Sequence, residues 1–373
     1  MTKYFLILIF NLSLNSNILN LPEFGLEQYQ PIIVNGKVVP NMPSSNHQQP
    51  EERYKVIESM LKNYQRPFTM LDIGAAQGYH SLMAAWQFPD SVFVMLEGNN
   101  NAYPKQGDSL LSICINNTQL NNIIHLNKSI YIEDLLNLSK CEHFDVVLVL
   151  NILHWLGGQW KSAIDVLMYL GDNIIIETPP AEESEEKRQI IAYLQSLGAK
   201  KIAEVPRHVG IDKVSPMFLL KSDKSKSLEK STWLKNDTQD KERDYRIVSN
   251  FTEKFLKKID TEAKPYKEVI APWHPGINLI TFKMYNGAYP LTDTLKQELF
   301  NWKDELHTDW QPNNFIVQGN KLKMIDYISE FCANVKMEAY TYNRYNKMLK
   351  FLESTDPKTL ESLFSEIVGS SRG

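Results

Sequence analysis

Two stretches of this sequence carry side chains whose types and spacing could do chemistry. The first, MLDIGAAQGYHS, sets Asp72 ahead of two glycines, Gly74 and Gly78, with Ala76 between them. Glycine lets a chain turn sharply off a strand and lets a ligand approach the backbone closely. The start of a following helix would add free N–H groups and a partial positive charge. We therefore predict a ligand site in a strand-to-helix turn.

The spacing of these glycines decides which ligand is favoured. A dinucleotide site uses G-x-G-x-x-G to hold a pyrophosphate, whereas this loop reads D-x-G-x-x-x-G. Glu97 ends the next apolar run, where a carboxylate can accept two hydrogen bonds from ribose hydroxyls. Glu133 and Asp134 follow a third apolar run in YIEDLL, and Asn151 and His154 follow a fourth in LNILHWL. Polar groups thus stand after four successive strand-like runs.

These four segments resemble the cofactor site of the class I S-adenosylmethionine (SAM)-dependent methyltransferases. The resemblance implies a Rossmann-like α/β fold, a parallel sheet with an antiparallel last strand. It implies that Glu97 binds the SAM ribose, that Glu133 or Asp134 lies beside the adenine, and that the segment of His154 lines the methyl-transfer site. The chain has no N-P-P-Y tetrapeptide and no obvious acidic metal cluster, which favours a hydroxyl or phosphate oxygen as methyl acceptor. The implied cofactor-binding residues are Asp72, Gly74, Ala75, Ala76, Gly78, Glu97, Gly98, Glu133, Asp134 and Asn151.

Several of these side chains also have a purely structural alternative. Asp72 could hydrogen-bond its own loop, and Glu97 could be an ordinary exposed acid at a strand end. A neutral His154 could take the proton from an acceptor hydroxyl as a catalytic base, or could be a buried, hydrogen-bonded histidine. Asn151 could orient the acceptor as a second catalytic group or cap the following turn.

The second stretch, HTDWQPNNFIVQGNKLKMIDY, begins at His307 and has the spacing H-x-D-x-x-x-x-N followed by a predicted hairpin. A kinase needs an acid beside the attacking hydroxyl, and an asparagine and a second aspartate for magnesium. The stretch resembles the catalytic loop of kinase-fold proteins. The resemblance implies ATP and Mg²⁺ as further cofactors, Asp309 as a catalytic residue, and Asn314 and Asp326 as metal ligands.

The chain departs from the kinase pattern in its glycines and in its phosphate-pairing lysine. No glycine occurs between Trp233 and Pro275, so a glycine-rich phosphate lid is missing from the sequence. Three lysines, Lys254, Lys257 and Lys258, could each pair with the phosphates. A compact active kinase and a degenerate domain kept as a binding surface both remain open.

The elements that must position these residues follow from hydrophobic spacing. Near-continuous apolar runs predict strands over 68–74, 91–98, 123–130, 144–151, 173–180, 200–205 and 215–222. Helical spacing separates them over 51–64, 79–88, 163–170 and 185–197, the last closed by Gly198. Strands alternating with helices predict a mostly parallel sheet covered on both faces. The link between the last two strands is too short for a crossover, so these two should pair antiparallel.

We divide the chain into an arm (1–50, with a hairpin at Asn35-Gly36), a methyltransferase domain (51–220), a polar linker (221–240) and a compact α+β kinase-like domain (241–373). In the last we expect short strands over 245–251 and 254–259. We also expect a helix in TDTLKQELFNW, the FIVQ-GN-KLKM hairpin, and helices over 329–353 and 357–368. This domain order resembles the bifunctional kinase–methyltransferases that terminate bacterial O-antigen polysaccharides, which implies a glycan or phosphoglycan acceptor.

Composition bounds the partners and the compartment. A net charge of −4 over 373 residues argues against nucleic acid as the main partner. The three cysteines are scattered, which fits a reducing, cytoplasmic compartment. The apolar run from Tyr4 to Phe10 is too short to span a membrane and lacks a signal-peptide cleavage site, so we expect a packed strand or a lead-in.

The sequence as a whole predicts a SAM-dependent O-methyltransferase acting on a glycan or another small-molecule acceptor, with a C-terminal kinase-like domain. Two alternatives remain. One is an ATP-dependent small-molecule or sugar kinase with an accessory SAM domain. The other is a methyltransferase whose C-terminal part only binds the acceptor.

Overall fold

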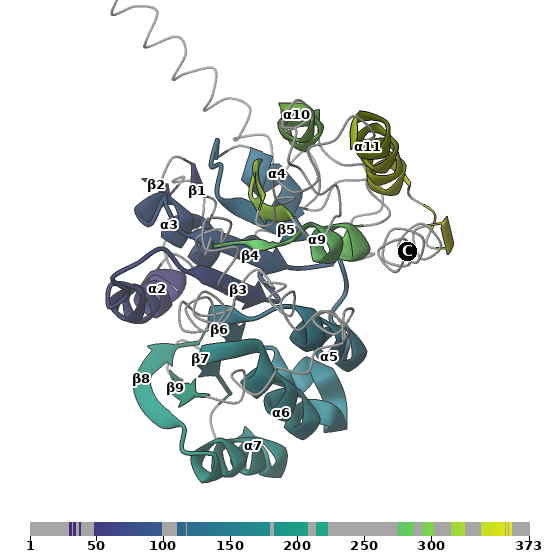
Figure 1. Cartoon of the computed structure of the whole chain (residues 1–373). Coiled ribbons are helices and arrows are strands. Elements are labelled where there is room, and N and C mark those ends of the chain that lie inside the picture. Colours follow the sequence, from purple (N-terminus) through teal and green to yellow (C-terminus); the bar gives the residue numbers. More distant parts are fainter. Residues whose placement is uncertain are drawn as a thin grey trace, which may run out of the picture.

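The structure is a computed structural model that describes residues 30–31, 33–34, 37–38, 48–98, 110–116, 118–179, 183–207, 214–222, 275–286, 293–301, 315–324, 337–354, 356 and 358–359. A seven-stranded sheet in the order β5-β4-β3-β6-β7-β9-β8 forms its centre (Figure 1). The strands are β3 (Thr69–Ile73), β4 (Val92–Leu96), β5 (Ile123–Leu126), β6 (Phe144–Leu150), β7 (Gly171–Glu177), β8 (Lys200–Pro206) and β9 (Val214–Lys221).

The topology of this sheet confirms the prediction from the sequence. The five strands from β3 to β7 are parallel, and β9 pairs antiparallel with both β7 and β8. The chain runs outward from β3 through β4 to β5, then returns to β6 on the other side of β3. Ligands of open α/β sheets bind at such a switch point, beyond the carboxyl ends of the strands. The expected third strand ends at Leu126 rather than at residue 130.

Helices cover both faces, so the central strands are almost wholly buried and lack polar alternation. One hydrophobic cluster packs α2 (Gln48–Leu61), α3 (Tyr79–Gln87) and α4 (Leu110–Asn116) on one face. The other cluster packs α5 (Ile132–Cys141), α6 (Trp160–Leu170) and α7 (Glu185–Ser196) on the opposite face. Gly198 follows α7 with a φ of 82°, as its predicted capping role requires. Sequence reasoning did not predict α4 or α5.

Two hairpins confirm predictions made from turn residues. Strands β1 (Ile33–Val34) and β2 (Lys37–Val38) pair around Asn35-Gly36, and β11 (Phe315–Gln318) pairs with β12 (Lys321–Met324) around Gly319-Asn320. The predicted helix in TDTLKQELFNW is α10 (Asp293–Asn301), and α11 (Met337–Glu353) ends where its prediction ended. The expected short strands over 245–251 and 254–259, residues 223–240 of the expected linker, and nearly all of the helix over 357–368 lie outside the described residues.

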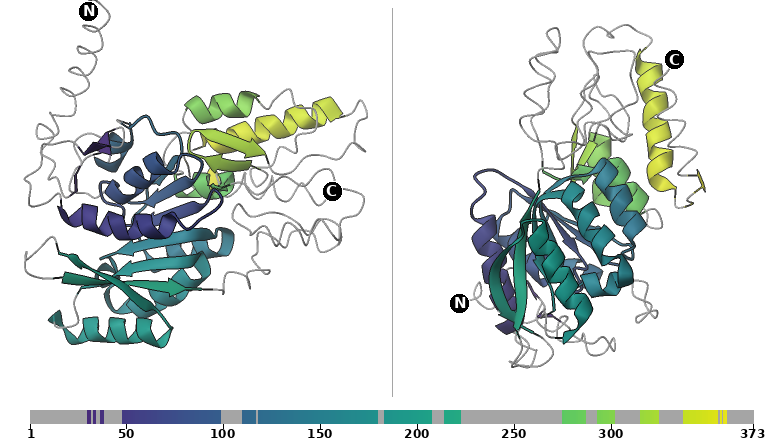
Figure 2. Two further views of the ribbon diagram at one scale, coloured as in Figure 1. Left: turned by 90° about the vertical axis from the view of Figure 1, so that its left-hand side faces the viewer. Right: turned by 90° about the horizontal axis from the view of Figure 1, so that it is seen from below.

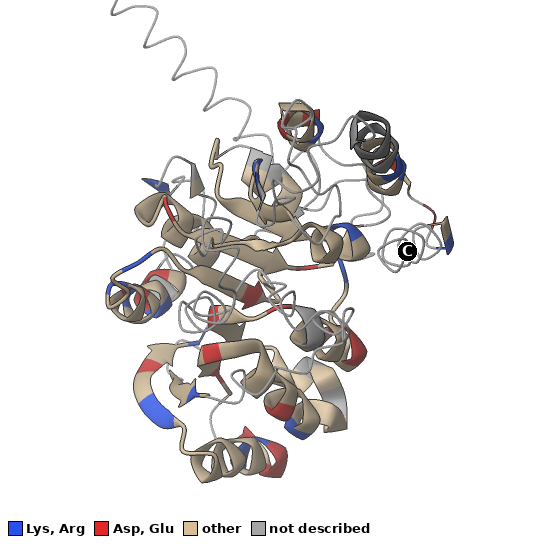
Figure 3. Ribbon diagram, in the orientation of Figure 1, with Lys and Arg blue, Asp and Glu red and all other residues tan. Residues whose placement is uncertain are grey.

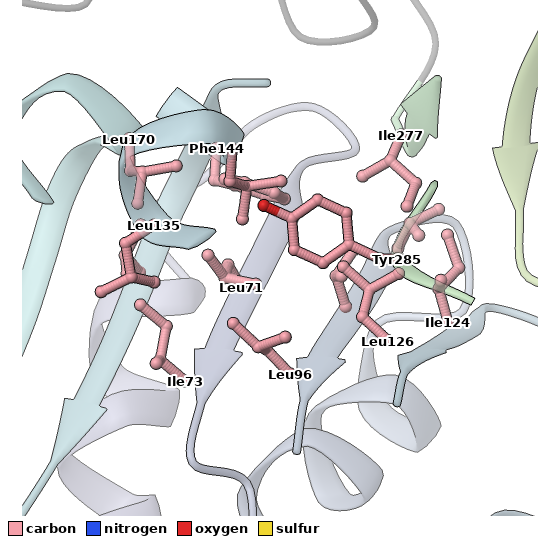
Figure 4. Packing of buried hydrophobic residues seen from close by; sticks show 14 of the residues in the cluster. Leu71, Ile73, Leu96, Ile124, Leu126, Leu135, Phe144, Leu170, Ile277 and Tyr285 are labelled. Atoms are coloured by element: carbon pink, nitrogen blue, oxygen red, sulfur yellow. The ribbon is translucent and has the colours of Figure 1, made fainter. Parts of the chain in front are cut away.

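The described C-terminal elements pack directly on the central sheet. Strand β10 (Ile277–Asn278) pairs antiparallel with β11, and α9 (Leu279–Tyr285) follows it at once. Ile277, Leu279 and Tyr285 belong to the same hydrophobic cluster as the side chains of β3, β4 and β5. Figure 4 shows Ile277 and Tyr285 beside Leu126 and Ile124. Both views of Figure 2 place the C-terminal elements on one side of the sheet. Sequence reasoning did not predict α9.

Buried polar contacts fix this segment to the sheet. The Gly276 N–H donates to Thr69 Oγ1 at 2.8 Å. The Glu142 carboxylate accepts from the Asn278 N–H at 2.8 Å and from Thr281 Oγ1 at 2.6 Å. Thr69, Glu142 and Thr281 are all at most 3% exposed, so none of these groups can turn to water for a partner. Residues 275–286 therefore form part of the layer that covers β3, β4 and β5.

Acidic and basic residues both occur in helices α2, α7 and α10 (Figure 3). Among the described helices, none is both long and apolar enough to cross a membrane.

Candidate cofactor site

The loop between β3 and α3 has the conformation that its glycines predict. Gly74 and Gly78 adopt φ angles of 75° and 79°, a region that L-residues rarely enter. A Cβ on Gly74 would lie 2.7 Å from Ile152 Cγ2, and one on Gly78 would lie 2.7 Å from Leu111 Cδ1. Both conformation and space therefore require glycine at the two positions.

Ala76 adopts the same left-handed conformation with a φ of 53°, without being glycine. Such a residue persists only where its surroundings hold it. Its N–H donates to Glu97 Oε2 at 2.9 Å. The carboxylate at the end of β4 thus binds the backbone of the loop, and the loop and the acid form one unit at the switch point. Burial raises the pKa of the Glu97 carboxyl, and the N–H of Ala76 acts in the opposite direction.

Asp72 lies beneath this loop and is 2% exposed. It accepts a hydrogen bond from Ser81 Oγ at 2.7 Å, which connects β3 to α3. Burial raises the pKa of the Asp72 carboxyl from 3.8 to about 7, although the Ser81 hydroxyl opposes the shift. Asp72 therefore stabilises the strand-to-helix turn through its hydrogen bond with Ser81.

Replacing Asp72 with asparagine should change how stability depends on pH. Between pH 3.8 and about 7, Asp72 is protonated in the folded protein but ionised in the unfolded chain. The carboxyl therefore costs stability as pH rises through this window, by at most about 1.4 kcal/mol per pH unit, and the cost is constant above it. Urea denaturation at pH 5 and pH 8 measures this. From pH 5 to pH 8 the wild type should lose more stability than the Asp72→Asn variant does. A stability difference between the two proteins that is the same at both pH values would contradict the raised pKa of Asp72.

The ends of β4 and β5 are held together by close contacts. His125 on β5 donates from Nε2 to the Glu97 carbonyl at 3.0 Å, taking that nitrogen as the protonated one. A Cβ on Gly98 would lie 2.7 Å from the backbone nitrogen of Ser129. The segment after β5 therefore passes directly over the residue that follows Glu97.

The two candidate adenine-side acids differ in their surroundings. Both lie in the first turn of α5. Glu133 is exposed, whereas Asp134 is 8% exposed and forms an ion pair between its Oδ1 and Lys128 Nζ at 2.5 Å. Asp134 is therefore the acid that the fold turns toward the segment after β5.

The ends of β6 and β7 carry a second polar group. Asn151 has a φ of 58°, and its N–H donates to the Glu177 carbonyl at 3.1 Å. Arg53 donates from Nε and Nη2 to the Glu177 carboxylate at 2.7 and 2.8 Å, and both side chains are buried. His154 is half-buried in the 3₁₀ turn Leu153–Gln159.

His80 is a buried residue of α3. Burial, together with the positive charge of Arg53, lowers the pKa of His80 to about 3.

The structure thus brings together the loop of 74–78 and Glu97 through a hydrogen bond, and brings Gly74 against Ile152, the neighbour of Asn151. The kinase-type residues His307, Asp309, Asn314 and Asp326, and the three candidate lysines, lie outside the described residues. Within the described part of the chain, no group of three or more His, Cys, Asp or Glu side chains could hold a metal ion.

Sequence reasoning missed several residues of this region. Gln30 in the N-terminal arm accepts the Tyr79 N–H at 3.1 Å, and its own N–H donates to Gln77 Oε1. One free donor of the α3 N-terminus is therefore taken by the arm. Nothing in the pattern around Gln30 indicates this contact. Glu177 could have been found, because it ends an apolar strand as Glu97 does.

No family model matches the sequence, and no curated protein matches it at a significant level. Solved structures to which the chain is similar include the bifunctional kinase–methyltransferase WbdD, at 16% identity and a TM-score of 0.41 over 95% of each chain. Precorrin-6y C5,15-methyltransferase from Geobacter metallireducens GS-15 has 15% identity and a TM-score of 0.33, over 50% of this chain and 91% of that one. The N-terminal domain of EvdMO1 with SAH bound has 13% identity and a TM-score of 0.35, over 47% and 82%. By its own strand order, this chain has a Rossmann-like class I methyltransferase fold.

Proposed function

We propose that this protein is a SAM-dependent O-methyltransferase that acts on a glycan or phosphoglycan and carries a C-terminal kinase-like unit. The observation that carries the proposal is the hydrogen bond from the Ala76 N–H to Glu97 Oε2. It joins a left-handed, glycine-bounded loop to a strand-end acid at the switch point of a parallel sheet, where α/β proteins bind nucleoside cofactors.

The residues present fit a bound SAM. Ala76 uses Oε2 of Glu97, which leaves Oε1 to accept hydrogen bonds from ribose hydroxyls. Asn151 Oδ1 is buried and has no hydrogen-bond partner among the described residues, so it can accept from the amino group of the methionine part. Asp134 would lie on the adenine side. The positive φ angles of Gly74 and Gly78 shape the loop against which the cofactor would lie.

SAM, when bound, supplies an electrophilic methyl group. The main task of the protein is then to align an acceptor oxygen with that methyl. His154 follows β6, the strand whose end borders the loop of 74–78. We therefore propose that His154 is the base that accepts the proton of the acceptor hydroxyl. Asn151 shares the same strand end and would fix the orientation of both reactants.

The glycan acceptor and the kinase-like unit rest on the order of motifs and on the spacing of His307, Asp309, Asn314 and Asp326. The hairpin between Asn314 and Asp326 is formed, as that spacing requires. Scattered cysteines support a reducing cytoplasmic location.

Glu97→Ala should weaken SAM binding about 10- to 100-fold, because a ribose hydroxyl would lose its buried acceptor at a cost of about 1–3 kcal/mol. Calorimetric titration with SAM measures the dissociation constant. Glu186→Ala, which removes an exposed carboxylate on α7, is the matched control and should bind as the wild type does. A wild-type protein that does not bind SAM would refute the proposal.

The same calorimeter separates the alternatives for the C-terminal unit. ATP with magnesium that gives heat on the wild type, but none on Asp326→Ala, would establish a nucleotide site and favour the kinase alternative. If titration of the wild type with ATP and magnesium gives no heat, the result favours the alternative in which the C-terminal unit only binds the acceptor.

A further inference from the structure

We propose that α9 of the C-terminal unit positions the cofactor site of the methyltransferase domain, through Tyr285 and Asn286 at its end. The inference rests on the proposed function, and it assigns to these two residues a role that their place in a kinase-like unit does not imply. They act on residues 125–134, which we name the adenine loop. They are positioning residues, since their contacts are to this loop.

Asn286 brackets the start of the adenine loop. Its Nδ2 donates to the His125 carbonyl at 2.8 Å, and its Oδ1 accepts the Asn127 N–H at 2.8 Å. The Asn286 side chain is 8% exposed. It therefore takes the place of a neighbouring strand for these two backbone groups at the edge of the sheet. Buried backbone groups need such partners.

Tyr285 holds the far end of the same loop. Its hydroxyl donates to the Asp134 carbonyl at 2.6 Å. The Lys128 ammonium lies 5.1 Å from the centre of the Tyr285 ring, within range of a cation–π contact, and pairs with the Asp134 carboxylate. Tyr285 thus contacts both the acid assigned to the adenine side and the cation that neutralises it.

The adenine loop in turn contacts Glu97, the acid proposed to bind the ribose. His125, whose carbonyl Asn286 binds, contacts the Glu97 carbonyl through Nε2 at 3.0 Å. Ser129 packs against Gly98 so closely that a Cβ there would lie 2.7 Å from its backbone nitrogen. A shift of the end of α9 would therefore move Asp134 directly and Glu97 through His125.

The other end of α9 provides a control for general destabilisation. Thr281 donates to Glu142 at 2.6 Å, a buried contact of the same helix that does not touch the adenine loop. Thr281→Val keeps the shape of the side chain and removes this bond. It should lower the melting temperature while leaving SAM affinity within about twofold, since SAM contacts are unchanged.

The test uses the full-length protein with three substitutions: Asn286→Ala, Tyr285→Phe and Thr281→Val. Asn286→Ala should weaken SAM binding about tenfold, because the loop loses the two hydrogen bonds that hold its start. Tyr285→Phe should weaken it by a few fold. Amide hydrogen exchange over residues 125–134 should be faster in both, and unchanged in Thr281→Val. If Asn286→Ala does not fold, Asn286→Asp keeps an acceptor for the Asn127 N–H and is judged by the same measurements.

The outcomes separate this inference from the proposed function. SAM affinity and loop exchange equal to the wild type in Asn286→Ala would overturn the inference. So would an equal loss of SAM affinity in Thr281→Val, because α9 would then act only by stabilising the fold. A wild type that does not bind SAM refutes the proposed function instead, and the exchange measurement still reports whether Asn286 orders the loop.

Discussion

Arg53→Ala is expected to lower the free energy of unfolding by about 4 kcal/mol, the range observed when one partner of a buried ion pair is removed. Glu177 is 1% exposed and receives two hydrogen bonds from the Arg53 guanidinium. Without them the buried carboxylate would lose its main hydrogen-bonding partner. The same substitution removes the ion pair that joins α2 to the end of β7. Urea denaturation of the purified protein measures the effect.

Two controls show whether the effect comes from the buried charge. Arg188→Ala breaks an exposed pair with Glu185 on α7 and should change stability by less than about 1 kcal/mol. The double variant Arg53→Met, Glu177→Leu removes both charges and should be more stable than Arg53→Ala alone. Equal losses in Arg53→Ala and Arg188→Ala would contradict the assignment of a buried pair.

Leu279→Ala is expected to lower the free energy of unfolding by about 3 kcal/mol, since truncation of a fully buried leucine leaves a cavity. Leu279 is 0% exposed and belongs to the cluster that includes Leu71 and Leu126 of the central sheet. Circular dichroism and tryptophan fluorescence during denaturation should shift together, because a shared core unfolds as one unit.

Met284, on the same helix, offers a matched control. Its side chain is 42% exposed, so Met284→Ala should change stability by no more than about 0.5 kcal/mol. If the two substitutions cost the same, or if Leu279→Ala affects only a separate second transition, α9 does not belong to the core of the sheet.

Much of the central fold could be predicted because its signals are local. The strands that became β3, β4 and β6 are buried on both faces and read as near-continuous apolar runs. Gly74 and Gly78 occupy backbone conformations that favour glycine, so their places in the loop were legible from the sequence. The Asn-Gly and Gly-Asn pairs predicted two hairpins, and the structure has both, β1–β2 and β11–β12.

The remaining features depend on contacts between distant residues. Helix α9 has only seven residues, too few for a helical period to stand out, and its burial is decided by strands more than 150 residues earlier. Asn286 and Gln30 act through single side chains on backbone groups, which leaves no pattern in the sequence. Helix α5 did carry a signal, the spacing of Leu135 and Leu138, which its acidic first turn obscured. The kinase-type assignments of Asp309, Asn314 and Asp326 stay predictions.

The bond between Thr69 and Gly276 joins residues 207 positions apart. This separation has a consequence for synthesis of the protein on the ribosome. The last strand of the sheet ends at Lys221, but Asn286, at the end of the segment that helps to cover β3, β4 and β5, is added 65 residues later. At about 5–20 residues per second, the apolar face over β3, β4 and β5 lacks the cover of α9 for roughly 3–13 seconds. During that interval the nascent chain presents a surface of the kind that chaperones bind, and a ribosome stalled between the two points would display it indefinitely.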